Sequence, residues 1–158
     1  MGTNGKRRDR LRLEHFVPYR LSILTNTVSN AIAGAYARRF GLSIPEWRVI
    51  AVLGLEPGLS AADVAERTAM DKVAVSRAVS SLMRSRRVVR ARANSDRRRS
   101  ELKLSRRGEN VYWRVVPFAR RYEQQLLADL SASERTSLDR LLNRLHQRAR
   151  ALGPVRAE

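Results

Sequence analysis

Cysteine is absent from this chain of 158 residues. Its absence excludes disulfide bonds, thiolate metal sites, a cysteine nucleophile and a cysteine redox sensor. Long apolar runs are absent too, because no stretch approaches the roughly 20 apolar residues that a membrane-spanning helix needs. The N-terminal residues lack the apolar core of a signal peptide. We therefore expect a cytoplasmic protein with no membrane partner.

Residues suited to catalysis are also scarce. The two histidines, His15 and His146, stand apart from other metal-ligand residue types. The sequence shows no Ser/His/Asp arrangement, no glycine-rich phosphate loop and no paired carboxylates on one predicted face. An enzyme, a bound metal and a cofactor are therefore not expected.

Acidic residues are outnumbered by basic ones, with 32 Lys and Arg against 15 Asp and Glu, which gives a net charge of +17. Because this excess needs an anionic partner, nucleic acid is the first candidate and an anionic membrane surface the second. Hydrophobic residues still make up 43% of the chain, enough for one domain with a real core.

Helical spacing of apolar residues predicts two helices in the first third of the chain and two more near its end. A long first helix should start at Pro18 and end before Gly41. Pro117 should kink the helix that contains it. Several side chains are suited to cap the first turn of a predicted helix. They are Ser43, Ser60, Asp71, Ser105 and Ser131.

The middle of the chain combines two short helices with two strand-like runs. The helices lie in SAADVAERTAMDKVAVSRAVSSLMRSR, and the second has an apolar inner stripe and a polar outer face. This is the helix-turn-helix pattern. The runs RVVRAR and SELKLS follow, separated by the turn formers Asn94, Ser95 and Asp96, and they predict a β-hairpin with a basic tip.

This order of elements resembles the MarR family of bacterial transcription regulators, which are winged-helix dimers. The resemblance spans about residues 18–150 and rests on IPEWRVIAVL, LSAADVAERTAMDKVAVSRAVSSL and DRRRSELKLSRRG. The last segment is the most specific, and its matching positions are Asp96, Arg98, Leu102, Leu104, Ser105 and Gly108. One position departs: Arg86 stands where the family usually places glycine after the recognition helix, and a left-handed conformation there would be unfavourable for arginine.

The resemblance implies a mainly α fold with a small β-hairpin wing, a winged helix-turn-helix that dimerises through its N- and C-terminal helices. Residues 1–17 would form a basic flexible N-terminal segment. Residues 18–153 would form a single unit. Within it, residues 43–105 would be the DNA-binding lobe, and residues 18–42 and 106–153 the dimerisation helices.

The outer face of the second short helix is the expected reader of DNA bases, because an α-helix fits the major groove. Arg77 is the best candidate for a base contact, since arginine pairs bidentately with guanine. The residues of this face are Lys72, Ser76, Arg77, Ser80 and Arg84. The alternative is a helix face that is merely solvated.

The hairpin tip carries Arg97, Arg98 and Arg99, which we expect to reach the minor groove or its phosphates. By the family pattern Arg98 is the inserted arginine. Asp96 is acidic in a basic loop, so we expect it to structure the wing by accepting hydrogen bonds. A loose charged hairpin is the alternative.

The outer helices carry more apolar surface than a small winged helix can cover. A homodimer would bury it and would match a palindromic operator in double-stranded DNA. The candidate dimer residues are Val115, Phe118, Leu126, Leu138, Leu142 and Leu145. Any one of them could instead belong to the core of its own chain.

Many family members bind a small ligand, often an aromatic carboxylate or phenol, between the dimer helices and the DNA-binding lobe. The polar or aromatic residues of the corresponding helices are His15, Tyr19, Arg20, Tyr36 and Trp47. Arginine with aromatic rings would suit an aromatic acid or an acyl-CoA. Trp47 could equally be core, and His15 could lie in a mobile terminus.

The sequence therefore predicts a sequence-specific DNA-binding transcriptional regulator, a homodimeric repressor released by a small ligand and nucleoid-associated when bound to DNA. The alternative is a basic nucleoid or RNA-binding protein that uses its charge without reading sequence. Both would bind duplex DNA with a steep salt dependence.

Overall fold

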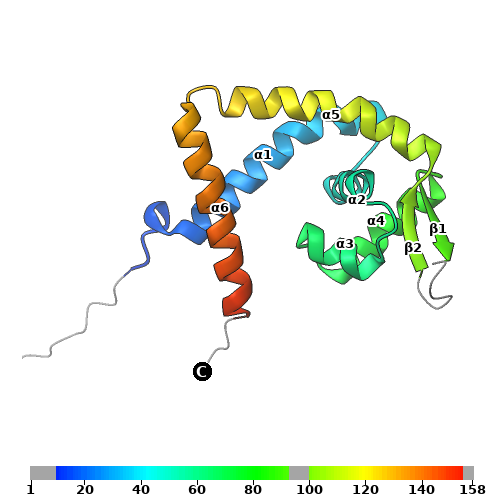
Figure 1. Ribbon diagram of the computed structural model, residues 1–158, viewed down its shortest axis with the longest axis horizontal. Coiled ribbons are helices and arrows are strands. Elements are labelled where there is room, and N and C mark those ends of the chain that lie inside the picture. Colours follow the sequence, from blue (N-terminus) through cyan, green and yellow to red (C-terminus); the bar gives the residue numbers. More distant parts are fainter. Residues whose placement is uncertain (1–9, 93–99, 155–158) are drawn as a thin grey trace, which may run out of the picture. The chain divides into compact units, whose positions relative to one another are not determined.

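The computed structural model describes residues 10–92 and 100–154, and these form a mainly helical chain with one two-stranded hairpin (Figure 1). This confirms the predicted fold class, a winged helix-turn-helix. The elements are η1 (Leu13–His15), α1 (Val17–Phe40), α2 (Ile44–Leu55), α3 (Ala61–Thr68), α4 (Lys72–Arg84), β1 (Val88–Arg92), β2 (Ser100–Leu104), α5 (Arg106–Leu126) and α6 (Ala132–Leu152).

Two compact units make up the chain, and they divide between Phe118 and Ala119, inside α5. The first unit contains η1, α1 to α4, the hairpin and the first part of α5. The second contains the rest of α5 and α6. The stretch 43–105 lies wholly in the first unit, which also includes α1. The assignment of DNA binding and dimerisation to separate stretches stays a prediction.

The predicted caps begin their helices. Ser43, Ser60 and Ser131 each form a complete capping box with the acidic residue three positions later. The Asp71 carboxylate accepts from the Ala74 backbone N–H at 2.8 Å, and the Ser105 hydroxyl accepts from the Gly108 N–H at 3.1 Å. These bonds satisfy backbone donors that have no partner inside the helix. The short helices α3 and α4 are therefore held at their starting residues.

The core of the first unit draws on every α-helix of that unit and on both strands. Its buried hydrophobic residues are Tyr36, Leu42, Val49, Ile50, Leu53, Val64, Ala65, Val75, Ala78, Val79, Leu82, Val88, Leu102, Val111 and Val115. Each large member contributes about 1.5–3 kcal/mol by leaving water. Since four of these residues come from α4, the core fixes which face of α4 remains outside.

Val115 was predicted as a dimer residue, but its side chain is only 1% exposed within a single chain. It packs in the core of the first unit, so it has no surface left to offer a second copy. For Val115 the core alternative therefore holds. The apolar spacing of a helix shows which residues are covered but does not show what covers them.

Arg86 adopts the left-handed conformation that glycine usually supplies, with φ +55°. The backbone N–H of Arg86 donates to the Met83 carbonyl at 3.0 Å, and the N–H of Arg87 donates to the Leu82 carbonyl at 2.8 Å. This pair of bonds is the Schellman arrangement that ends many helices. The departure from the family pattern therefore leaves the end of α4 in its usual geometry.

The hairpin is antiparallel, with Val88 opposite Leu104 and Arg90 opposite Leu102. Gly108 joins it closely to α5, because a Cβ atom on Gly108 would lie 2.0 Å from the Arg87 carbonyl oxygen. Only glycine leaves room for the backbone at that point. The glycine of the family motif therefore has a steric role between the wing and α5.

Candidate nucleic-acid interface

The outer face of α4 is exposed along its length. Its polar residues are Lys72, Ser76, Arg77, Ser80 and Arg84, all of which lie at the surface. Behind them the apolar stripe of the same helix is buried in the core, which fixes the rotation of α4 about its axis. Small side chains between the two arginines leave the helix backbone close to the surface. The face therefore has the shape and polarity that a major-groove reader needs.

A groove runs beside α4 and the start of α2. It is lined by Ser43, Pro45, Glu46, Ala74, Ser76, Arg77, Ala78, Ser80, Ser81 and Arg84. Glu46 supplies a carboxylate to this groove. Partial burial would raise the pKa of Glu46, but hydrogen bonds from Ser43 and Ser81 and the charge of Arg87 outweigh it and lower that pKa. The groove therefore carries a fixed negative charge beside Arg77 and Arg84.

The predicted wing-tip residues, Arg97, Arg98, Arg99 and Asp96, lie outside the described residues. The strands that lead to the tip carry Arg90, whose side chain is exposed. It shares a depression with the first turn of α3, lined by Ser60, Ala61, Ala62, Asp63, Arg90, Ser100 and Leu102. Sequence reasoning missed Arg90, because its position depends on the strand register.

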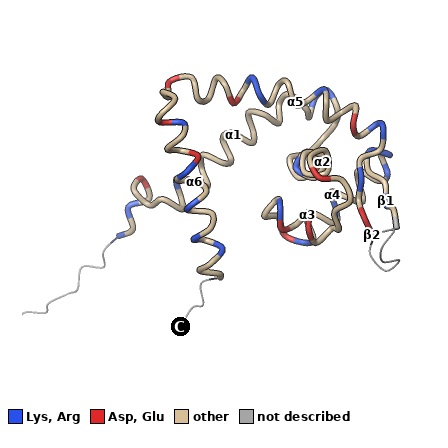
Figure 2. Tube along the Cα trace, in the orientation of Figure 1, with Lys and Arg blue, Asp and Glu red and all other residues tan. Residues whose placement is uncertain are grey.

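Basic residues lie on the hairpin and along α5, whereas the middle of α1 carries none (Figure 2). Some basic residues are paired: the Lys103 ammonium lies 3.2 Å from a Glu101 carboxylate oxygen, and Arg67 pairs with Glu56. Exposed pairs of this kind contribute about 0–1 kcal/mol each to stability. Their main effect is to reduce the positive charge on the surfaces that carry them.

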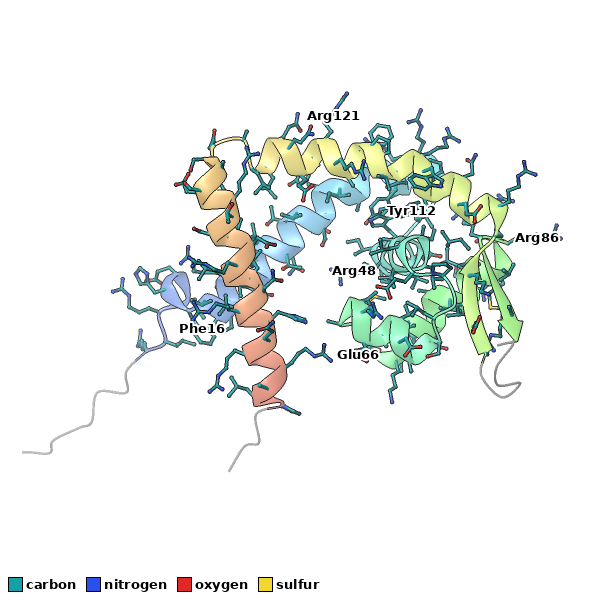
Figure 3. The ribbon with its side chains drawn as sticks, viewed as in Figure 1. Phe16, Arg48, Glu66, Arg86, Tyr112 and Arg121 are labelled. Atoms are coloured by element: carbon teal, nitrogen blue, oxygen red, sulfur yellow. The ribbon has the colours of Figure 1, made fainter. Side chains whose placement is uncertain are left out.

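Tyr36 and Trp47, two of the predicted ligand residues, come together in an aromatic stack. Their ring centroids are 5.5 Å apart, and the Trp47 ring lies 6.4 Å from Tyr112 of α5. Figure 3 shows Tyr112 directed from α5 toward α2. Gly54 makes room for it, because a Cβ there would lie 2.6 Å from the Tyr112 ring. The stack therefore joins three helices.

Arg48 is the charged residue of this neighbourhood. Its guanidinium donates to the Ser29 hydroxyl at 3.4 Å. Burial raises the pKa of Tyr36, and the positive charge of Arg48 opposes that rise. Arg48 and Tyr112 were both absent from the sequence prediction. Neither stands out in sequence, since each joins Tyr36 only through the packing of a different helix.

The other predicted ligand residues do not join this stack. His15 ends η1, and Tyr19 and Arg20 lie exposed in the first turn of α1. Seventeen residues of one helix separate Tyr19 from Tyr36, a rise of about 25 Å at roughly 1.5 Å per residue. The predicted ligand residues therefore fall into two groups.

Apart from Val115, the predicted dimer residues are exposed in the single chain. Phe118, Leu126, Leu138, Leu142 and Leu145 are between 36% and 48% exposed. The first turns of α1 add further exposed apolar side chains, among them Val17, Leu21 and Leu24. This exposed apolar surface lies on the helices that were predicted to dimerise.

Two capped helices joined by a tight turn, a polar outer face on the second and an adjoining hairpin define a winged helix-turn-helix protein of the DNA-binding class. Residues 40–99 match the sequence model of the MarR family. Over that stretch the chain is similar to the MarR family of transcriptional regulators.

Solved structures of this family share the fold over most of the chain. A MarR/EmrR family transcriptional regulator from Acinetobacter sp. ADP1 is 27% identical, with a TM-score of 0.81 over 87% of this chain and 97% of that one. The PcaV regulator from Streptomyces coelicolor, solved with its natural ligand, is 26% identical, with a TM-score of 0.73 over 88% and 97%.

FabT from Streptococcus pneumoniae, solved with DNA, has the same fold at 23% identity, with a TM-score of 0.70 over 88% of this chain and 98% of that one. No curated protein sequence matches the chain. Among the helices of residues 10–92 and 100–154, none is long and apolar enough to cross a membrane.

Proposed function

We propose that the protein is a homodimeric, sequence-specific regulator that acts in the cytoplasm as a repressor and leaves its operator when a small ligand binds. The observation that carries this proposal is the α4 helix, whose inner stripe is buried and whose outer face presents Lys72, Ser76 and Arg77 at its first turns. FabT, which shares the fold, has been solved in complex with DNA.

Base reading is assigned to Arg77, and backbone contacts to the surrounding cations. Arg77 lies where α4 is bordered by the small residues Ser76 and Ser80, so its guanidinium can reach a guanine edge without steric competition. Arg90 beside the start of α3 is an additional candidate for a phosphate contact. Arg98 at the wing tip is assigned to the minor groove by the family pattern.

A gel-shift titration of the chain's own promoter against scrambled DNA of equal length tests the proposal. Arg77→Ala should weaken promoter binding by about 1–3 kcal/mol and reduce discrimination between the two duplexes. Arg144→Ala on α6 removes the same charge from another helix and serves as the matched control. Equal affinity of the unmodified protein for promoter and scrambled DNA would refute sequence reading and favour the nucleoid or RNA-binding alternative.

Arg98→Ala tests the division of labour between the wing and α4. It should weaken binding to both duplexes and leave the major-groove preference largely intact, because minor-groove insertion responds to shape and charge. The same titration measures it. If Arg98→Ala reduced discrimination between the two duplexes as much as Arg77→Ala does, the separate roles of the wing and α4 would be contradicted.

Dimerisation is supported by the leucine face of α6, where Leu138, Leu142 and Leu145 recur at helical spacing and remain exposed. Light scattering at micromolar concentration should give twice the mass of one chain. Leu142→Asp with Leu145→Asp should reduce that mass to a single chain, since two buried charges would face an apolar surface. A single-chain mass for the unmodified protein would overturn the dimer.

The ligand site is assigned to the stack of Tyr36, Trp47 and Tyr112 with Arg48 beside it, which suits an aromatic acid or its CoA ester. PcaV, which shares the fold, has been solved with a ligand. Release from DNA would be a population shift, so the ligand must bind the released state more tightly than the DNA-bound state. Thermal-shift screening against aromatic acids tests it, with Arg48→Gln expected to abolish the shift.

A further inference from the structure

A second concentration of positive charge lies where α1 ends and α5 begins. It is a depression in the first unit, lined by Arg39, Phe40, Arg87, Arg106, Arg107, Asn110, Val111 and Arg114. Five of these eight residues are arginine and none is acidic. They come from the end of α1, from the turn between α4 and β1 and from the start of α5. The fold therefore brings the arginines together.

The contrast with the α4 groove shows how unusual this lining is. The groove has ten lining residues, of which two are arginine and one is the ionised Glu46. The lining itself holds no carboxylate, and like charges gathered in one depression repel one another, although Arg87 also interacts with Glu46 of the α4 groove. An anion bound among them would remove that repulsion, so the lining is best explained by an anionic ligand.

Several of these arginines are held in place by their neighbours. The Arg114 guanidinium lies 5.1 Å from the centroid of the Phe40 ring, and that of Arg39 lies 5.6 Å from the centroid of the Phe118 ring. Arg87 donates to the Phe40 carbonyl, and its Nε is buried without a hydrogen-bond partner in the described part of the chain. Side chains already held in position lose less entropy when a ligand binds.

We propose that this depression binds a small anion that carries at least two phosphate or carboxylate groups. Each guanidinium presents a planar fork of donors that matches two oxygens of such a group, and the cations in the lining are all arginine rather than lysine. One singly charged group would occupy one fork and leave the others unpaired. The start of the 21-residue helix α5 adds its own positive end at Arg106 and Arg107.

The same oxygens could come from a free small anion or from DNA backbone phosphates outside the operator. We assign the site to the free anion, because the arginines line a depression instead of following an extended surface. This binding does not require that α4 read DNA. The experiment therefore uses a small probe and a duplex in separate arms.

Isothermal titration of the full chain with inorganic pyrophosphate at low ionic strength tests the site. The unmodified protein should bind one pyrophosphate per chain. Arg106→Gln with Arg114→Gln should weaken this binding about tenfold or more, because two charge-assisted contacts are lost. Arg144→Gln with Arg148→Gln removes the same charge from α6 and should leave the affinity unchanged.

Two results would overturn the proposal. Equal pyrophosphate binding by both double variants would mean that only the net charge matters. The second result has two parts: the unmodified protein does not bind pyrophosphate, and only the Arg106/Arg114 variant binds scrambled duplex more weakly. That result would assign the cluster to DNA phosphates. If the Gln variant does not fold, Arg106→Lys with Arg114→Lys replaces it. This variant keeps the charge but loses the planar guanidinium groups, so it should bind pyrophosphate several-fold more weakly than the unmodified protein.

Discussion

The core of the first unit and the helix α6 of the second differ in how their apolar residues are covered. Leu82 of α4 is fully buried, whereas Leu142 of α6 is 47% exposed, although both occupy the apolar stripe of an amphipathic helix. None of the described residues of α6 is buried. The core of the first unit is therefore covered within one chain, whereas the leucine face of α6 stays exposed in the single chain.

The largest expected difference follows from truncating one leucine in each region. Leu82→Ala should lower the free energy of unfolding by about 2–5 kcal/mol at every protein concentration, because it leaves a cavity in the core. If the proposed dimer forms, Leu142→Ala should have an effect that shrinks on dilution, because separated chains gain nothing from the interface in either variant. Thermal melts over a range of concentrations measure both. If Leu142→Ala lowered the free energy of unfolding as much as Leu82→Ala at every protein concentration, the two regions would not differ in how their leucines are covered.

A smaller effect is expected at the joint between the hairpin and α5. Gly108→Ala should destabilise the first unit by about 1–3 kcal/mol, because the new methyl would overlap the Arg87 carbonyl. Gly34→Ala in α1 is the matched control, since nothing lies within 4 Å of its Cβ position. It should stabilise α1 by roughly 0.5–1 kcal/mol. Urea denaturation of the two variants should therefore move the midpoint in opposite directions.

The smallest effects should come from removing one serine N-cap in each region. Ser43→Ala should lower the free energy of unfolding of the first unit by about 0.5–2 kcal/mol. Ser131→Ala should only increase hydrogen exchange in the first turn of α6, which no core holds. A global destabilisation by Ser131→Ala would show that α6 is folded cooperatively with the first unit.

The Ser43 cap also predicts a pH dependence. The Glu46 carboxyl has a pKa lowered from its ordinary value of 4.5, despite partial burial, by hydrogen bonds from Ser43 and Ser81. The stabilisation is present above pH 4.5 and is lost as the pH falls through the lower pKa of the folded protein. With Glu46→Gln, the melting temperature should fall less between pH 5 and about pH 3 than it does in the unmodified protein.

Much of the fold could be predicted from sequence because its signals are local. The caps at Ser43, Ser60 and Ser131 depend only on residues three positions apart, and all three form as expected. Arg86 shows the limit of such reasoning, because the backbone hydrogen bonds that end α4 accompany a φ of +55° despite the weak preference of arginine for that conformation.

The sites were less predictable, since their members come from separate elements. Tyr36 and Trp47 could be named as polar-tipped aromatic residues, but Arg48 and Tyr112 join them only when three helices pack together. Val115 and Leu138 carry the same apolar signal, yet one is buried in its own chain and the other is 36% exposed. Residue spacing identifies apolar faces, while only the fold identifies what they contact.

The aromatic stack supplies the protein with an optical reporter. Trp47 is packed between Tyr36 and Tyr112, whereas Trp113, the second of the two tryptophans, is 66% exposed. Emission from Trp47 should respond to changes inside the stack, and emission from Trp113 should respond to quenchers in solution. With Trp113→Phe, tryptophan fluorescence would follow the aromatic stack alone, without any attached dye.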